Sequence, residues 1–180
     1  KEGTHVRIAI IGYSGSGKST LAAQLGQSYG VPVLHLDSVH WLPGWVERAR
    51  EEEKALVRAF LDQNESWVID GNYSALYYEE RLEKADRIIF LNFNRFVCVH
   101  RATKRARQYH GRTRPDMGAG CTEKMDLEFA KWILYTGRTG RIRERYRKLR
   151  SAYPQKFIEI RNQKALSAFT ARATEAKDCS

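Results

Sequence analysis

The chain of 180 residues has the length of one domain. Hydrophobic residues make up 42% and charged residues 29%, which provides enough apolar material for a core and excludes a disordered chain. The formal net charge is +10, and residues 95–150 carry the excess: they hold 16 Lys and Arg against 5 Asp and Glu, whereas the rest of the chain holds 15 against 16. We therefore expect an anionic partner to meet that region.

Other features narrow the class of protein. The three cysteines (Cys98, Cys121 and Cys179) are odd in number and lack metal-binding spacing, so we expect neither a disulfide framework nor a zinc site. No apolar run approaches the ~18 residues of a membrane span. No signal peptide opens the sequence, and we expect a reducing, cytoplasmic location.

Short apolar runs alternate with longer amphipathic stretches along the chain. The runs predict strands at 6–11, 33–36, 67–69, 87–91 and 157–160. The stretches predict helices at 19–28, 47–61, 96–109 and 125–150, the last broken near Gly137 and Gly140. This alternation indicates an α/β fold in which right-handed crossovers build a parallel sheet with helices on both faces.

The strongest motif runs from Gly12 to Thr20 and reads GYSGSGKST, which fits the Walker A pattern G-x-x-x-x-G-K-[ST]. Glycines let backbone N–H groups turn around a phosphate, and the next helix adds its positive end. Lys18 can reach the β- and γ-phosphates, and the Ser19 hydroxyl can ligate Mg²⁺. We expect a nucleoside triphosphate to bind Gly12, Ser14, Gly15, Ser16, Gly17, Lys18, Ser19 and Thr20.

Two aspartates come directly after predicted strands. A carboxylate beside a phosphate loop is the hard oxygen that Mg²⁺ needs, usually through water. We assign Asp70 to the metal together with Ser19, and Asp37 to the side of the phosphoryl acceptor. The alternative for both is a helix cap or a turn residue. Gly71, Asn72 and Tyr73 follow Asp70 and would lie close to a bound group.

The ordered set of motifs resembles the adenylate-kinase-like branch of P-loop kinases and, within it, the DNA topology modulation proteins. The resemblance covers most of the chain. It rests on the phosphate loop, on His35-Leu36-Asp37 with Trp41 and Trp45, on the segments 67–73 and 85–91, and on the basic helix from Arg101.

This resemblance implies a three-layer α/β/α P-loop fold in one domain spanning 1–180, with five parallel strands in the order 2-3-1-4-5. It implies a helical acceptor-binding insert at about 38–66 and a lid at about 110–124. Its expected ligands are ATP and Mg²⁺, with Arg101 and Arg105 gripping the nucleotide and a backbone loop at Asn162 and Gln163 bordering the adenine.

The chain also departs from this pattern. Adenylate kinases carry an arginine shortly after the second strand and another directly after the Asp-Gly pair. Here residues 35–45 contain no arginine, and Asn72 follows Gly71. AMP as the acceptor is therefore in doubt, which favours a hydroxyl-bearing or atypical nucleotide acceptor. For a hydroxyl acceptor, Asp37 would serve as the base.

Arginines and aromatic residues supply the remaining candidates. Arg101 and Arg105 are four residues apart and share a helix face, where they would stabilise a migrating phosphoryl group with Lys18. Arg112 and Arg114 lie in the expected lid, and Arg138 and Arg141 are candidates for the phosphate site. The aromatic residues Trp41, Trp45, Tyr73, Tyr77 and Tyr78 would either stack on a flat acceptor or form a core under the insert.

Two functions stay open. The first is a kinase that moves the γ-phosphoryl group of ATP to a small acceptor. The second is a nucleic-acid-associated, DNA topology modulating regulator that uses ATP as a switch, with the arginines of 138–150 as a polyanion-binding strip. The alternative for the same arginines is a solubilising, solvated surface. No N-K-x-D motif of a GTPase and no L-S-G-G-Q signature of a transport ATPase occurs.

Overall fold

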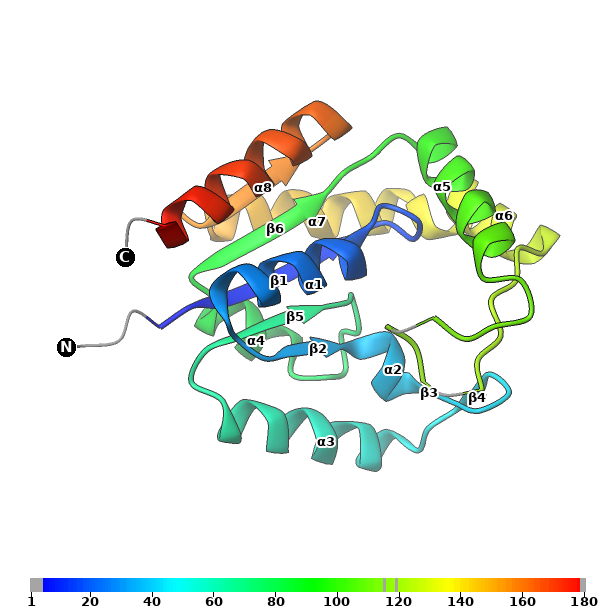
Figure 1. The fold of residues 1–180 in the computed structure, drawn as a ribbon, viewed down its shortest axis with the longest axis horizontal. Helices are drawn as coiled ribbons and strands as arrows, with labels where there is room; N and C mark the ends of the chain where they lie inside the picture. Colours follow the sequence, from blue (N-terminus) through cyan, green and yellow to red (C-terminus); the bar gives the residue numbers. More distant parts are fainter. Residues whose placement is uncertain (1–4, 115, 119, 179–180) are drawn as a thin grey trace.

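The computed structural model describes residues 5–114, 116–118 and 120–178. Its main sheet has five parallel strands in the order β2-β5-β1-β6-β7 (Figure 1). The strands are β1 (Arg7–Gly12), β2 (Val33–His35), β5 (Trp67–Asp70), β6 (Arg87–Leu91) and β7 (Phe157–Ile160). Counted along the chain, these five strands have the expected order 2-3-1-4-5. The labels differ because a separate hairpin takes β3 and β4.

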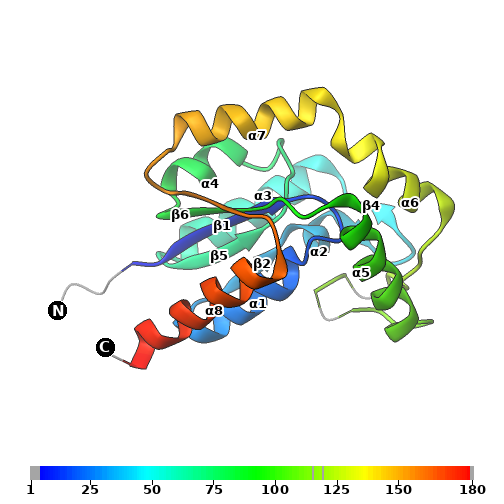
Figure 2. The same cartoon turned by 90° about the horizontal axis from the view of Figure 1, so that it is seen from above.

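Helices cover both faces of the sheet, which confirms the three-layer α/β/α prediction (Figure 2). One face carries α1 (Lys18–Tyr29) and α8 (Gln163–Asp178), and the other carries α3 (Arg50–Gln63), α4 (Tyr78–Lys84) and α7 (Gly140–Ala152). The carboxyl ends of the strands are flanked by α2 (Leu36–His40), α5 (Arg95–Gln108), α6 (Leu127–Leu134) and the 3-10 turn η1 (Thr136–Arg138). Gly137 and Gly140 thus lie where the predicted helix 125–150 breaks.

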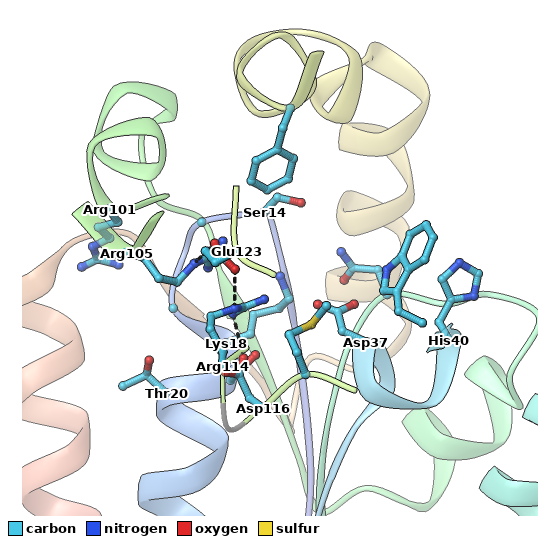
Figure 3. Close-up of a pocket in the computed structure, with 18 of the residues that line it drawn as sticks. Ser14, Lys18, Thr20, Asp37, His40, Arg101, Arg105, Arg114, Asp116 and Glu123 are labelled. Atoms are coloured by element: carbon cyan, nitrogen blue, oxygen red, sulfur yellow. Dashed lines mark hydrogen bonds and ion pairs between the residues drawn. The ribbon is translucent and has the colours of Figure 1, made fainter. Parts of the chain in front are cut away.

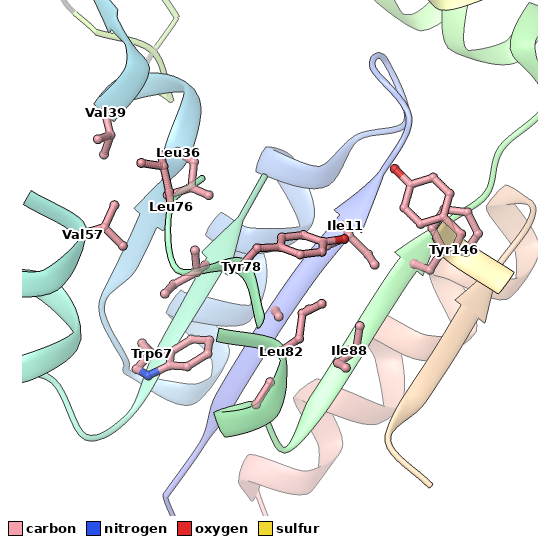
Figure 4. Packing of buried hydrophobic residues seen from close by; sticks show 14 of the residues in the cluster. Ile11, Leu36, Val39, Val57, Trp67, Leu76, Tyr78, Leu82, Ile88 and Tyr146 are labelled. Atoms are coloured by element: carbon pink, nitrogen blue, oxygen red, sulfur yellow. The ribbon is translucent and has the colours of Figure 1, made fainter. Parts of the chain in front are cut away.

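Two apolar clusters hold these layers together. On the α3–α4–α7 face, Trp67 and Ile69 of β5 pack with Val57 of α3, Leu82 of α4 and apolar residues of β1 and β6 (Figure 4). On the other face, β1 and β6 pack against α1, α5 and α8. The strands β1, β5 and β6 are buried on both faces and read as continuous apolar runs, which explains why the sequence located them.

The segment between β2 and β5 differs from its prediction. The helix expected from residue 47 begins at Arg50, and residue 47 belongs instead to a hairpin of β3 (Trp41–Leu42) and β4 (Val46–Glu47). Gly44 and Trp45 make the turn with left-handed φ angles of 77° and 62°. Turn residues interrupt the helical pattern here, and the helix starts only after Ala49.

The phosphate loop and Asp70 lie at the carboxyl ends of β1 and β5, and Asp37 lies just past the end of β2, all at one edge of the sheet. Ligands of open α/β sheets bind at this edge. Among the described residues, no helix has both the length and the apolar character needed to cross a membrane.

Candidate active site

One large cleft opens at the carboxyl edge of the sheet (Figure 3). Its volume is about 1470 Å³. Sites for one small ligand usually enclose ~300–1,000 Å³, so this cleft has room for two ligands. The phosphate loop and α5 form one side, α2 and the hairpin form the other, and Lys18 lies between them.

The phosphate loop turns as its glycines require. Gly15 has a φ of 77°, and a Cβ on it would lie 2.5 Å from the carbonyl oxygen of Cys98 in α5. The first N–H groups of α1, like those of every helix, have no intrahelical acceptor. The N-cap residue Gly17 has no side chain that could accept from them, so they stay open. These groups and the helix dipole form an anion-binding site facing the cleft.

Lys18 lies partly buried in the cleft, and its ammonium donates to the carbonyl oxygen of Tyr13 at 3.1 Å. Burial lowers its pKa, and the nearby carboxylates of Asp37 and Asp70 oppose that change. A lysine bound only to a carbonyl oxygen can exchange that weak contact for a phosphate oxygen.

Asp70 is 4% exposed and joins two other side chains. The Ser19 hydroxyl donates to one carboxylate oxygen at 2.9 Å, and Nδ1 of His35 lies 2.5 Å from the other. Burial alone would lower the pKa of His35, but the hydrogen bond and charge of Asp70 outweigh it and raise the pKa. No group of three or more His, Cys, Asp or Glu able to hold a metal occurs in the described part of the chain. A metal here would be held by the Ser19 hydroxyl, the Asp70 carboxylate and oxygen atoms of a bound ligand. An all-oxygen set of this kind suits Mg²⁺.

Arg101 and Arg105 of α5 both line the cleft, as their spacing predicted, and Figure 3 shows Arg105 extending toward Glu123. Arg101 donates to the carbonyl oxygen of Ser16 and to Oε1 of Gln163, both at 2.6 Å. Its guanidinium also lies over the ring of Phe93 at 4.0 Å, and burial lowers its pKa. It therefore bridges the phosphate loop to the start of α8.

A buried carboxylate joins α5 to the 110–124 segment. Glu123 is 5% exposed, and its two oxygens lie 2.7 Å from Nε of Arg105 and 2.7 Å from Nε of Arg114. Arg114 also donates to Asp116 at 2.8 Å. The segment thus faces the cleft through Arg114, whereas Arg112 is exposed and outside the described lining. The contact of Arg112 with a ligand therefore stays a prediction.

The α2 side of the cleft holds two polar pairs. The Tyr73 hydroxyl donates to Oδ1 of Asp37 at 2.7 Å, and burial together with the Asp37 charge raises the pKa of Tyr73. Nδ1 of His40 lies 2.5 Å from the carboxylate of Glu53, which is 2% exposed. The His40 ring contacts two aromatic rings: it meets Trp41 edge to face at a centroid distance of 4.5 Å and lies tilted against Tyr73 at 4.8 Å.

Three residues expected to contact ligands make hydrogen bonds that support the phosphate loop, and one of them, Asn72, also lines the cleft. The N–H of Gly12 donates to Oδ1 of Asn72 at 3.1 Å, and Nδ2 of Asn72 donates back to the carbonyl oxygen of Gly12 at 2.7 Å. The N–H of Ser16 donates to the carbonyl oxygen of Tyr13. Since their N–H groups are occupied and neither residue is among the described lining, Gly12 and Ser16 form framework.

Other expected contacts lie elsewhere in the fold. Arg138 stands behind the loop, with its guanidinium 3.8 Å from the Tyr13 ring and bound to the carbonyl oxygen of Phe93. Asn162 caps the first turn of α8 through the N–H of Ala165, so the expected adenine loop is a helix start, and Gln163 alone reaches the cleft. Tyr78 is a core residue, and Tyr77 packs against the core.

Sequence reasoning missed several lining residues. His40 lines the cleft and lies one turn after Asp37 in α2, a spacing that could have paired the two. Glu53 and Glu123 carry no signal, because their partners come from other elements. Trp132 of α6 donates to the Ser14 hydroxyl at 3.1 Å and, with Phe129, covers the phosphate loop.

Comparison with known proteins shows the fold. No protein-family model matches the chain, and no curated protein matches it. The solved shikimate kinase from Acinetobacter baumannii, in complex with shikimate, aligns with a TM-score of 0.56 and 17% identity over 97% of this chain and 90% of that one. The protein TT1252 from Thermus thermophilus aligns with a TM-score of 0.55 and 19% identity over 96% and 95%. The chain therefore shares the three-layer fold of these two proteins, and its resemblance to the DNA topology modulation proteins stays a prediction.

Proposed function

We propose that this protein is a kinase that uses ATP and Mg²⁺ to phosphorylate a small acceptor. The observation that carries the proposal is the single cleft in which the phosphate loop and Lys18 face the Asp37–Tyr73 pair. A fold like that of the shikimate kinase supports it. Phosphoryl transfer needs little covalent chemistry from a protein, so this arrangement of charges and two subsites is what such a reaction requires.

The phosphate-loop side would bind the nucleotide. The open N–H groups at the start of α1 would hold its phosphates, with Lys18 on the β- and γ-phosphate oxygens. Ser19 and Asp70 would hold Mg²⁺, directly and through water, and their joined, buried oxygens suit that ion. The metal neutralises charge that develops on the phosphate oxygens.

The opposite side would bind the acceptor. A hydroxyl placed at Asp37 could pass its proton to that carboxylate as its oxygen bonds to the γ-phosphorus. The bond from this phosphorus to the bridging oxygen breaks, and ADP leaves with the electron pair. Arg101 and Arg105 border the nucleotide end, where they would stabilise the moving charge. The 110–124 segment would act as a lid that excludes water.

The test is transfer of label from γ-labelled ATP to nucleosides, nucleotides and small hydroxyl metabolites in the presence of Mg²⁺. We expect one class of acceptor to become labelled, and Lys18→Ala to abolish the transfer. Lys148→Ala is the matched control, because Lys148 is exposed on α7 and outside the described cleft lining. Release of free phosphate from ATP with no labelled acceptor, at the same rate in the Lys18 variant, would contradict the proposal.

A further inference from the structure

The α2–α3 side of the cleft is lined by an excess of negative charge. From this segment, Asp37, Glu47 and Glu53 line the cleft against one guanidinium, that of Arg50. Buried Glu53 lies 3.3 Å from Nε of Arg50 and 2.5 Å from Nδ1 of His40. The carboxylate of Glu53 thus already pairs with His40 and Arg50, the two basic groups that α2 and α3 bring to the cleft.

The cations of the 110–124 segment that line the cleft are paired in the same way. Arg114 is 8% exposed and binds Glu123 and Asp116, at 2.7 and 2.8 Å. Lys124 lies 3.1 Å from Asp126. On this side of the cleft, every described cationic side chain therefore has a carboxylate partner. A bound phosphate or carboxylate would have to displace one of these partners and would meet the remaining negative charge.

Aromatic rings line the same side of the cleft as these carboxylates. Trp41 and Trp45 meet edge to face with centroids 5.5 Å apart, and His40 joins Trp41 to Tyr73. Rings beside carboxylates form the kind of surface that binds ammonium groups and the flat faces of sugars. Aromatic rings alone would not distinguish charged from uncharged ligands. This side of the cleft carries both aromatic rings and carboxylates, so it can.

We infer that the acceptor is a hydroxyl compound without negative charge that binds best when it carries an ammonium group, such as an aminated sugar. This inference rests on the proposed function. Oδ1 of Asp37 accepts the Tyr73 hydrogen bond, and Oδ2 has no hydrogen-bond partner among the described residues. The acceptor hydroxyl would give its proton to Oδ2 as its oxygen attacks the γ-phosphorus and ADP leaves. The ammonium group would lie toward Glu47, whose side chain is 71% exposed at the rim.

The experiment compares acceptors that differ in charge but share a carbon skeleton: glucosamine, glucose and gluconate, and, as a second set, adenosine and AMP. Label transfer from γ-labelled ATP gives kcat/KM for each. We expect glucosamine to exceed glucose by about fivefold or more, the effect of one ion pair in a water-filled cleft, and gluconate to be the poorest of the three. In the second set, we expect adenosine to exceed AMP.

A charge reversal in the rim sharpens the test. Glu47→Lys should raise KM for glucosamine and lower KM for gluconate. Since repulsion replaces attraction, the preference should fall by about 25-fold or more. Glu79→Lys is the control, since Glu79 is exposed on α4 outside the described lining, and it should leave the preference unchanged. An unchanged preference in Glu47→Lys would overturn the assignment of the ammonium group to this rim.

The outcomes separate this inference from the proposed function. Faster transfer to gluconate or AMP than to their uncharged or cationic counterparts would overturn the inference and leave the kinase in place. Absence of transfer to every acceptor would overturn the proposed function. In that case, quenching of tryptophan fluorescence by glucosamine and by gluconate, compared with Trp41→Phe, still decides the charge preference. Equal binding of the two compounds would overturn it.

Discussion

The two sides of the cleft are built by different means. On the phosphate-loop side, backbone conformation and helix geometry position the groups, and the side chains that assist them come from the ends of adjacent parallel strands, β1 and β5. On the other side, α2, the hairpin, α3 and the 110–124 segment meet through pairs of charged or aromatic side chains.

This difference teaches where each side is sensitive. A backbone cradle binds any phosphate chain and depends on a few glycines and on the strand register. A wall of side-chain pairs sets which second ligand fits, and single substitutions can change it. We therefore expect substitutions on the phosphate-loop side to remove activity, and substitutions on the α2–α3 side to change selectivity.

The largest expected effect is that of Lys18→Met. Removing one charge-stabilising donor from a phosphoryl-transfer site typically costs ~10²–10³ in kcat. Burial already lowers the pKa of Lys18, which shows that its charge is costly in the folded state. We therefore expect the variant to lose activity while its melting temperature stays equal or rises. Label transfer and thermal unfolding by circular dichroism measure the two. A falling melting temperature would contradict this account.

The next effect is that of Asn72→Ala, which tests whether Asn72 supports the loop rather than a ligand. The change removes both hydrogen bonds to Gly12 and leaves its N–H without a partner, at a cost of about 1–3 kcal/mol in the free energy of unfolding. The loosened loop should raise KM for ATP more than KM for the acceptor.

Asn64→Ala provides the comparison for Asn72. It removes one amide hydrogen bond, to the carbonyl oxygen of Phe60, far along the chain from the loop. We expect some loss of stability in that variant and an unchanged KM for ATP. If Asn72→Ala instead raised only the KM for the acceptor, that result would support the ligand contact of Asn72 expected from the sequence.

Most of the fold could be predicted because its signals are local. Apolar runs marked all five strands, and the motif from Gly12 to Thr20 marked the loop and the start of α1. The missed elements lack such signals. Helix α4 is a single short helix entered through a left-handed Tyr77, with φ 50°. Helix α8 was missed because a loop was expected at Asn162 and Gln163, where this helix begins.

The site was predictable to the same extent. Motif residues and those at strand ends, such as Lys18, Ser19 and Asp70, lie where their spacing placed them. The residues that sequence reasoning missed depend on tertiary pairing: Glu53 meets His40 only because α3 folds back on α2, and Glu123 meets Arg105 across the 110–124 segment. A carboxylate in a charged stretch looks the same whether it is buried or solvated, so no pattern distinguishes these two.

The pair Arg112 and Arg114 tests how the 110–124 segment acts. Arg114 is buried and pairs with both Glu123 and Asp116, so its loss would leave Glu123 with Arg105 alone and would take from Asp116 its ion pair at the cleft. We expect Arg114→Ala to lower kcat/KM by about tenfold. Arg112 is exposed, and Arg112→Ala should change it less than about twofold, as surface substitutions do. Equal losses in the two variants would contradict the division of roles between these arginines.

The smallest effect concerns the Arg58–Glu80 pair, which joins α3 to α4 away from the cleft. Hydrogen bonds from Arg58 and then Lys84 lower the pKa of Glu80 from 4.5 to about 2. A carboxyl with a lowered folded-state pKa stabilises the fold above its unfolded value, and that stabilisation is lost as the pH falls toward 2. Wild type should therefore melt above Arg58→Gln at pH 6, and the gap should close between pH 5 and pH 2. The gap should not vanish at pH 6, because in Arg58→Gln the carboxylate of Glu80 keeps only its hydrogen bond from Lys84, at 2.8 Å.

The control is Arg141→Gln, since Arg141 is exposed on α7. Its melting temperature should differ from wild type by the same small amount at every pH. A gap for Arg58→Gln that stays the same in acid would mean that Arg58 stabilises the fold by its packing on Tyr77, at 4.2 Å, rather than by its ion pair with Glu80.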